Sequence, residues 1–173
     1  MKKIGIFYGP TGGSTEKVAK LIQKKLGAEN ADIKPIIGTK AIDLDKYENI
    51  ILGCSTIGGE TWNSAHAKPD WDIFKPELDK INYSGKTFAL FGLGDNISYP
   101  RHFVDNMGIV GKVLLSKKAK VVGQTSKDDY EFIDSEALID NKFIGLPINE
   151  DFDFDKTDER VEKWVQTIKQ NFN

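Results

Sequence analysis

The sequence has little of the side-chain chemistry on which metalloproteins and disulfide-rich proteins depend. Its one cysteine, Cys54, cannot form a disulfide within the chain and offers no cysteine cluster for zinc or an iron–sulfur centre. With only His66 and His102 as histidines, we do not expect a histidine-based metal site. These shortages argue against a structural or catalytic metal and against a fold held by disulfides.

Long apolar runs are also absent. None approaches the roughly 18 residues that a membrane-spanning helix needs. The opening "MKKIGIFYGP" is too short and too quickly interrupted for a secretory signal, so we expect a cytoplasmic protein. The 173 residues are 39% hydrophobic and 29% charged, as in ordinary globular proteins, and we expect residues 1–173 to form one domain.

Charge is unevenly distributed along the chain, although the formal net charge is only −2. Residues 128–160 contain 12 acidic and 3 basic side chains. This stretch is either a solvated surface or an acidic face that docks basic partners or repels a second negative charge. No basic stripe interleaved with aromatic residues is present, so nucleic-acid binding is not expected.

Short apolar segments alternate with helical patterns. The segments typical of strands covered on both faces are 3–8, 33–37, 49–54, 86–92, 120–124 and 142–148. Helical spacing of apolar residues predicts helices over 15–27, 70–80, 102–118 and 158–172. This alternation indicates an α/β fold, a doubly wound three-layer sandwich with right-handed crossovers. Segments 55–70 and 125–141 are longer than simple connections, which is typical of functional loops or of small added structure.

The stretch "YGPTGGSTE" joins the first expected strand to the first expected helix. Glycines remove Cβ atoms there, so backbone N–H groups can converge on an anion, and the helix N-terminus adds positive partial charge. Thr11, Ser14 and Thr15 add hydroxyl groups, whereas the loop contains no lysine or arginine. The pattern favours a phosphate monoester held in place by neutral donors, with a plain tight turn as the alternative.

The common nucleotide motifs do not fit this turn. Gly13 is followed by Ser14, where a Walker loop requires lysine. The glycine spacing does not give the G-x-G-x-x-G of a dinucleotide site. The acidic residues that a phospho-receiver domain needs after its first and third strands are missing as well.

Two later loops would meet this turn at one edge of the sheet. "STIGGETW" (55–62) follows the third strand, and "FGLGDNISYPRHF" (91–103) follows the fourth and contains Asp95, Asn96 and Tyr99. In open α/β sheets, ligands bind beyond the carboxyl ends of the strands. A phosphate cradle, a polar turn for an amide-edged ring and a flat aromatic residue together describe a flavin mononucleotide (FMN) site.

With these motifs, the chain resembles the flavodoxins of the long-chain type over essentially its whole length. The resemblance is carried by "IGIFYG", "NIILGCST", "SGKTFALFGLGDNISY" and the stretch from "VVGQTSKDDYEF" to "VEKWV". An insertion at about 124–143, which divides the last strand, marks the long-chain members. The resemblance implies a five-stranded parallel sheet in the order 2-1-3-4-5, noncovalent FMN, and low-potential one-electron transfer between redox proteins. It further implies a monomer that accepts electrons from a reductase or oxidoreductase and passes them to a low-potential enzyme.

The resemblance also assigns site residues. Within the phosphate loop, Gly13 and Thr15 match the family pattern, whereas Pro10 and Gly12 depart from it. Tyr99 matches the tyrosine that stacks on the outer face of the flavin. The residues predicted to bind the cofactor are Pro10, Thr11, Gly12, Gly13, Ser14, Thr15, Ser55, Thr56, Ile57, Gly58, Gly59, Leu93, Gly94, Asp95, Tyr99, His102, Phe103 and Asp151. For His102, an ordinary surface position is the alternative, and Asp151 is assigned to the ribityl chain.

The loop after the third strand departs most from the family. Ile57 stands where family members commonly have a tryptophan over the inner flavin face, so Ile57 or Trp62 is expected to cover that face. Gly58 and Gly59 lie where, in the family, a backbone carbonyl rotates to accept the N5–H of the neutral semiquinone. Glycine tolerates that rotation at little steric cost, and the resulting hydrogen bond separates the two one-electron couples.

Two other functions remain possible from the sequence. A flavin enzyme, such as a small quinone or azo-compound reductase, would need a substrate pocket, which the longer loop 57–70 could form. A binding module for another phosphorylated ligand would account for Pro10, Gly12 and Ile57. The sequence favours the electron carrier, which is not an enzyme in its own right.

Overall fold

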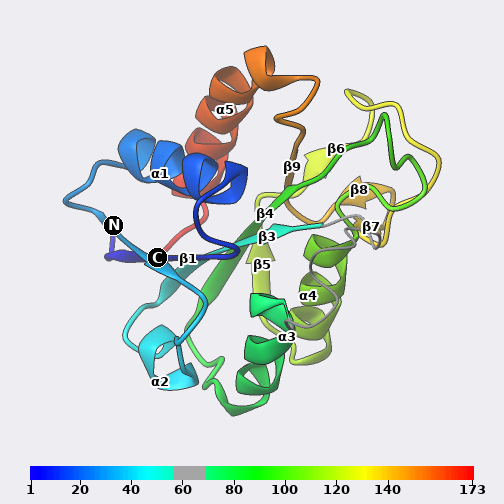
Figure 1. Ribbon diagram of the computed structural model, residues 1–173. Helices are drawn as coiled ribbons and strands as arrows, with labels where there is room; N and C mark the ends of the chain where they lie inside the picture. Colours follow the sequence, from blue (N-terminus) through cyan, green and yellow to red (C-terminus); the bar gives the residue numbers. More distant parts are fainter. Residues whose placement is uncertain (57–68) are drawn as a thin grey trace.

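A computed structural model describes residues 1–56 and 69–173. Its main sheet has the strand order β2-β1-β3-β4-β5, with β9 also paired to β4, and all of these pairs are parallel (Figure 1). The strands are β1 (Ile4–Tyr8), β2 (Ala31–Pro35), β3 (Asn49–Ser55), β4 (Thr87–Leu93), β5 (Lys120–Val122) and β9 (Leu146–Ile148). The predicted order 2-1-3-4-5 is confirmed.

The outer edge of β4 is shared by two separate strands. β5 pairs with its first half, from Thr87 to Ala89, and β9 pairs with its second half, from Phe91 to Leu93. The last strand is therefore divided, as the insertion predicted. The predicted single strand 142–148 is wrong in one respect, because its first two residues belong to a different sheet.

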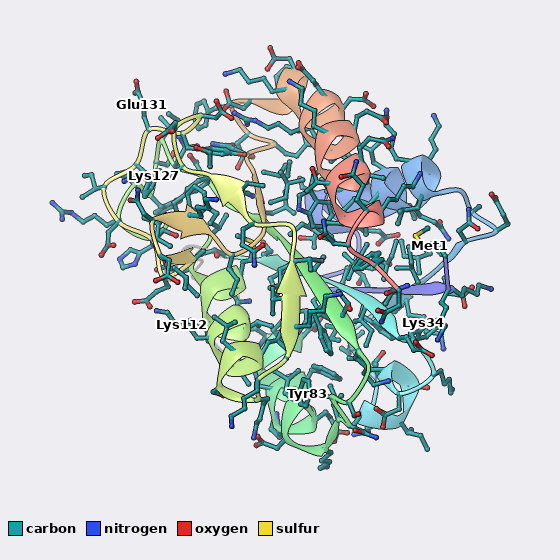
Figure 2. All side chains as sticks on the ribbon, turned by 180° about the vertical axis from the view of Figure 1, so that it is seen from behind. Met1, Lys34, Tyr83, Lys112, Lys127 and Glu131 are labelled. Atoms are coloured by element: carbon teal, nitrogen blue, oxygen red, sulfur yellow. The ribbon has the colours of Figure 1, made fainter. Side chains whose placement is uncertain are left out.

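That different sheet is formed by the insertion. Its strands, antiparallel and in the order β6-β8-β7, are β6 (Thr125–Ser126), β7 (Leu138–Ile139) and β8 (Lys142–Phe143). Between β8 and β9 the chain passes so close to β4 that a Cβ on Gly145 would lie 2.1 Å from the carbonyl oxygen of Leu90. Figure 2 shows the insertion, with Lys127 and Glu131, on the opposite side of the molecule from Met1.

Helices cover both faces of the main sheet. They are α1 (Ser14–Leu26), α2 (Ala41–Leu44), α3 (Asp70–Phe74), α4 (Asp105–Ser116) and α5 (Thr157–Lys169), with 3₁₀ turns at Lys75–Lys80 and Phe154–Lys156. α1 and α5 lie on one face, and α3 and α4 on the other (Figure 1). Successive strand residues point to opposite faces. Ile6 therefore packs with α1 and α5, whereas Phe7 packs with α3 and α4.

Some element boundaries differ from the prediction for local reasons. The predicted helix 70–80 changes from α to 3₁₀ after Phe74, because Pro76 has no N–H to continue the α-helical ladder. The second strand lies two residues earlier than the apolar run 33–37, because its register is set by pairing with β1. The four-residue helix α2 was not predicted, since its apolar pattern is too short to detect.

Buried tryptophans attach helices to the sheet layer. Trp71 of α3 donates its indole N–H to the carbonyl of Gly53 at 3.0 Å, and Trp164 of α5 donates to Gly123 at 2.8 Å. Cys54 is fully buried, and burial raises the pKa of its thiol. All three residues belong to the buried core.

Two features of the structure concern membrane-spanning proteins and metalloproteins, the classes against which the composition argued. Within residues 1–56 and 69–173, no helix is both long and apolar enough to cross a bilayer. In the same part of the chain, no group of three or more His, Cys, Asp or Glu residues is placed to hold a metal ion.

The insertion packs directly on α4 at a glycine. A Cβ on Gly108 would lie 2.2 Å from the backbone carbon of Glu136 and 2.3 Å from the nitrogen of Ala137. At Gly111, one turn later in α4, the nearest atom to such a Cβ is the terminal methyl of Ile144 at 2.6 Å. Backbone cannot move aside as the end of a side chain can, so of these two glycines only Gly108 requires the absence of a Cβ.

We predict that Gly108→Ala lowers the free energy of unfolding by about 1–3 kcal/mol relative to Gly111→Ala, because it forces the insertion away from α4. Both substitutions gain the same helix propensity, about 1 kcal/mol, so their difference isolates the backbone clash. Chemical denaturation of the two variants measures it. Equal stabilities would show that the insertion does not rest on α4 at this point.

Candidate functional site

A cavity of about 300 Å³ opens beyond the carboxyl ends of β1, β3, β4 and β9. It is lined by Pro10, Gly13, Ser14, Thr15, Ser55, Thr56, Leu93, Gly94, Asp95, Tyr99, Glu150 and Asp151. Four segments that are far apart in the sequence therefore meet at this edge of the sheet, as parallel pairing requires.

The start of α1 forms one wall of the cavity. Gly13 precedes the helix in an extended conformation, and no side chain among the described residues caps the helix N-terminus. The first N–H groups of an α-helix have no partner within the helix, and here they adjoin the hydroxyls of Ser14 and Thr15. An uncapped helix N-terminus with adjacent hydroxyl donors favours an anion.

The turn before α1 is held in shape from the helix itself. Gly12 adopts a left-handed conformation, with φ +80°, and its N–H donates to Oε2 of Glu16 at 2.7 Å. Hydrogen bonds from Lys20 and from this N–H hold the pKa of Glu16 below its usual range. A Cβ on Gly12 or Gly13 would meet no described atom within 4 Å, so the turn faces open space.

The loop after β3 is fixed by the start of α4. Thr56 donates its N–H to Leu93 at 2.9 Å, and its hydroxyl oxygen accepts the N–H of Asn106 at 3.0 Å. The side-chain amide of Asn106 donates in turn to the carbonyl of Ser55 at 3.2 Å. These bonds hold Ser55 and Thr56 at the cavity wall.

Asp95 organises the loop after β4. Its Oδ1 accepts the N–H groups of Ile97 and Ser98, each at 2.9 Å. Partial burial raises the pKa of Asp95, but the hydrogen bonds from Ser98 and Ile97 outweigh it, so the pKa lies below its usual value. Tyr99 follows, donates its N–H to the carbonyl of Asp95, and is 51% exposed as a residue. The loop thus presents a flat aromatic face beside the cavity.

Two buried amides connect this loop to β9 and to the insertion. Asn149 donates to Oδ1 of Asn96 at 2.8 Å, and Asn96 donates to the carbonyl of Glu131 at 2.8 Å. The oxygen of Asn149 accepts the N–H of Asp151 at 3.0 Å. This network directs Glu150 and Asp151 to the cavity and connects the insertion to both loops.

Most of the predicted cofactor residues meet at the cavity. Those that line it are Pro10, Gly13, Ser14, Thr15, Ser55, Thr56, Leu93, Gly94, Asp95, Tyr99 and Asp151. Thr11 and Gly12 belong to the exposed turn above it. Ile57, Gly58, Gly59 and Trp62 lie outside the described residues, so the choice between Ile57 and Trp62 stays a prediction.

Two predicted residues lie elsewhere, and one lining residue was not predicted. Phe103 is fully buried and packs on Tyr130 and Phe143 of the insertion, with ring centroids 5.4 and 5.7 Å apart. The imidazole of His102 is 71% exposed, and its Nδ1 lies 2.9 Å from Oδ2 of Asp105. Glu150 lines the cavity but was overlooked, although its position between Asn149 and Asp151 directly after a strand was a usable signal.

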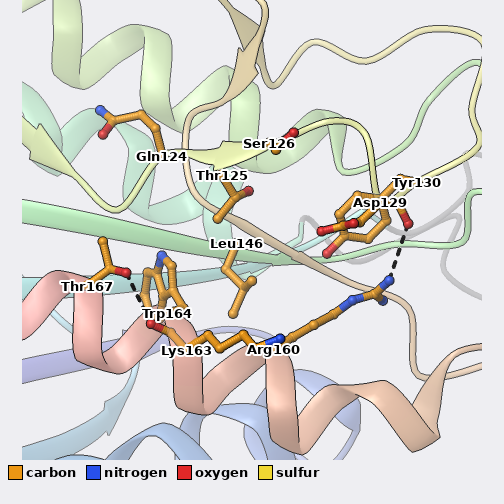
Figure 3. A pocket seen from close by; sticks show the side chains of 10 residues that line it. All are labelled: Gln124, Thr125, Ser126, Asp129, Tyr130, Leu146, Arg160, Lys163, Trp164 and Thr167. Atoms are coloured by element: carbon orange, nitrogen blue, oxygen red, sulfur yellow. Dashed lines mark hydrogen bonds between the residues drawn. The ribbon is translucent and has the colours of Figure 1, made fainter.

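A second cavity, of about 210 Å³, separates the insertion from α5 (Figure 3). The guanidinium of Arg160 lies over the ring of Tyr130, 4.4 Å from its centroid, and donates to the carbonyl of Asp129 at 3.4 Å. Leu146 and Trp164 form its apolar floor. It lies beside the divided edge strand, not at the carboxyl ends where the loops converge, so the first cavity is the candidate site.

Comparisons with known proteins identify what this arrangement resembles. The family model described as flavodoxin matches residues 6–164. A flavodoxin of Nostoc sp. is 39% identical over 171 residues, which is 99% of this chain and 98% of the relative. A flavodoxin of Buchnera aphidicola is 41% identical over 174 residues, with 100% and 99% coverage. Among solved structures, Fusobacterium nucleatum flavodoxin bound to flavin mononucleotide has a TM-score of 0.86 and 29% identity, with both chains covered completely.

The lowered pKa of Asp95 gives a pH-dependent prediction. A carboxyl whose pKa is depressed by folding stabilises the protein above its unfolded pKa, and this contribution is lost as the pH falls through the folded value. Asp95→Ala should therefore lower the free energy of unfolding of the cofactor-free protein by about 1 kcal/mol at neutral pH, and by less below about pH 4. Denaturation of both proteins across this range tests it, and a pH-independent difference would contradict it.

Proposed function

Because the chain belongs to the flavodoxin family, we propose that it is a low-potential one-electron carrier that uses noncovalently bound FMN to shuttle electrons between redox proteins. The observation that carries this proposal is the cavity itself, which joins the uncapped start of α1 to the exposed ring of Tyr99. A single ligand with a phosphate at one end and a flat ring at the other matches both features.

We expect the phosphate of FMN to bind at the start of α1. The N–H groups of the first helical turn and the hydroxyls of Ser14 and Thr15 supply neutral donors. The departures from the family pattern at Pro10 and Gly12 remove two side-chain hydroxyls, yet the backbone donors do not depend on side-chain identity. The donor set is therefore sufficient for a phosphate monoester.

We expect the ring end of the cofactor to lie between Tyr99 and the loop that follows β3. The half-exposed ring of Tyr99 supplies a stacking surface. FMN, when bound, supplies the redox chemistry, while the protein supplies binding and electrostatics. Asp95, Glu150 and Asp151 place carboxyl groups around the cavity, so additional negative charge in it is disfavoured. This charge arrangement supports a low reduction potential.

Redox partner proteins follow from the family, and the surface suggests how they dock. Ile97, Phe152 and Phe154 are each more than half exposed. Ile97 lies between the lining residues Asp95 and Tyr99 in the chain, and the two phenylalanines follow the lining residue Asp151. The aromatic residues alternate with Asp151, Asp153 and Asp155. We infer that partners present a basic rim around an apolar contact, and we therefore favour docking as the role of the acidic stretch. A reductase or oxidoreductase as donor, a low-potential enzyme as acceptor, the monomeric state and a cytoplasmic location stay predictions.

The function is tested by anaerobic reductive titration of the FMN-loaded protein, followed by visible absorbance. We expect two resolved one-electron steps, with a half-reduced form accumulating near the midpoint. A single two-electron step would move the assignment to a flavin reductase, and rapid NAD(P)H oxidation without a partner would support that outcome. Failure to bind FMN would favour the alternative that the protein is a binding module for another phosphorylated ligand.

The phosphate cradle is tested by Thr15→Val, which removes a hydroxyl while keeping the shape of this buried side chain. We expect the Kd for FMN to rise about tenfold and the Kd for riboflavin, which lacks the phosphate, to stay the same. Quenching of flavin fluorescence measures both. Thr157→Val, the same change in the first turn of α5, is the matched control and should alter neither.

An equal loss of affinity for FMN and riboflavin in Thr15→Val would contradict the placement of the phosphate at α1.

A further inference from the structure

Glu150 combines burial with an unpaired oxygen. It follows β9, lines the cavity, and its side chain is only 6% exposed. Its Oε1 lies 3.4 Å from Nζ of Lys17 in the first turn of α1. Its Oε2 is buried and has no hydrogen-bond partner among the residues that the structure describes.

An unsatisfied buried carboxylate oxygen is costly, because the atom gives up its hydration and gains no hydrogen bond. Buried polar groups in folded proteins are nearly always paired, so an exception at a binding cavity points to a ligand that supplies the missing donor. Asp151, the next residue, does not incur this cost, because it is exposed and water can pair with its carboxylate.

The position of Glu150 selects which part of the ligand supplies that donor. It shares the cavity with Gly13, Ser14 and Thr15, where the phosphate is expected, and its salt bridge ties it to the same helix. In FMN, the groups next to the phosphate are the hydroxyls of the ribityl chain, which can donate hydrogen bonds. The phosphate oxygens themselves are acceptors and cannot satisfy a carboxylate.

We propose that Glu150 determines specificity for the polyol chain of the flavin: its Oε2 accepts a hydrogen bond from a ribityl hydroxyl, while Lys17 balances its charge. This inference rests on the proposed function, since it requires a flavin in the cavity. It assigns the principal polyol contact to the buried Glu150, whereas the resemblance pointed to the exposed Asp151.

The test compares three ligands that differ by one part each: FMN, riboflavin without the phosphate, and lumiflavin without the polyol chain. Fluorescence quenching gives their Kd values for the wild-type protein and for Glu150→Ala, Glu150→Gln and Glu29→Gln. Glu29, exposed between α1 and β2, is the control for a change of charge away from the cavity. Thermal unfolding of each cofactor-free variant reports whether it folds.

We expect Glu150→Ala to raise the Kd values for FMN and riboflavin by the same factor, about tenfold, and to leave the Kd for lumiflavin unchanged. Glu150→Gln, which keeps an acceptor oxygen, should recover part of this loss, and Glu29→Gln should change nothing. Because Glu150→Ala removes an unpaired buried carboxylate, the cofactor-free variant should unfold at a temperature no lower than the wild type, while FMN stabilises it less.

Three outcomes would overturn the proposal. Tighter FMN binding by Glu150→Gln, with riboflavin unchanged, would show that Glu150 repels the phosphate. An equal rise in the Kd values for all three ligands would show that Glu150 acts on the flavin ring or on the shape of the cavity. No change in any Kd would show that Glu150 takes no part in flavin binding. Wild-type protein that binds none of the flavins would instead refute the proposed function, before any variant is compared.

Discussion

The parallel pairing of every strand in the main sheet is the constraint on which the site depends. Because β1, β3, β4 and β9 run in the same direction, the loops that follow them emerge at one edge. The second half of β4 pairs with β9, a strand that the chain reaches only after the insertion. This pairing moves Asn149 and its two acidic successors to the same edge as the start of α1. The insertion lies between the two strands that share this edge of β4, and none of its residues lines the cavity.

Charge is distributed within the cavity according to what each part is expected to hold. At the phosphate end, the donors are backbone N–H groups and hydroxyls, and the nearby Lys17 is engaged by Glu150. Around the rest of the cavity, the charged groups are carboxylates, with the pKa of Asp95 held low by backbone donors. A cofactor whose only permanent negative charge is a terminal phosphate suits this arrangement. The same carboxylates oppose further negative charge on the bound ring, which is the property that a strong one-electron reductant needs.

Much of this could be predicted from the sequence. The strands and the phosphate turn follow from local patterns, whereas the strand order was implied by the resemblance to the family. Alternating apolar runs predicted the sheet, and the Gly-Gly-Ser-Thr turn predicted the anion site at the start of α1. Two kinds of feature could not be predicted. Phe103 was assigned to the cofactor because it lies near Tyr99 in the chain, but its burial depends on the insertion folding back onto it. The position of Glu150 after a strand was a signal for the cavity edge, but its burial depends on the network around Asn149 and Asn96, which joins residues 53 positions apart. The break of 142–148 between two sheets likewise depends on contacts distant in sequence.

The central claim is that the neutral donors at the start of α1 bind a dianionic phosphate. Phosphorus NMR of the FMN-loaded protein through a pH titration tests it most directly, because a free phosphate monoester takes up a proton near pH 6. The account predicts that the resonance of the bound phosphate does not shift as the pH falls through this range, since the N–H groups of the first turn stabilise the dianion. A bound phosphate that titrates as it does in free FMN would contradict the account.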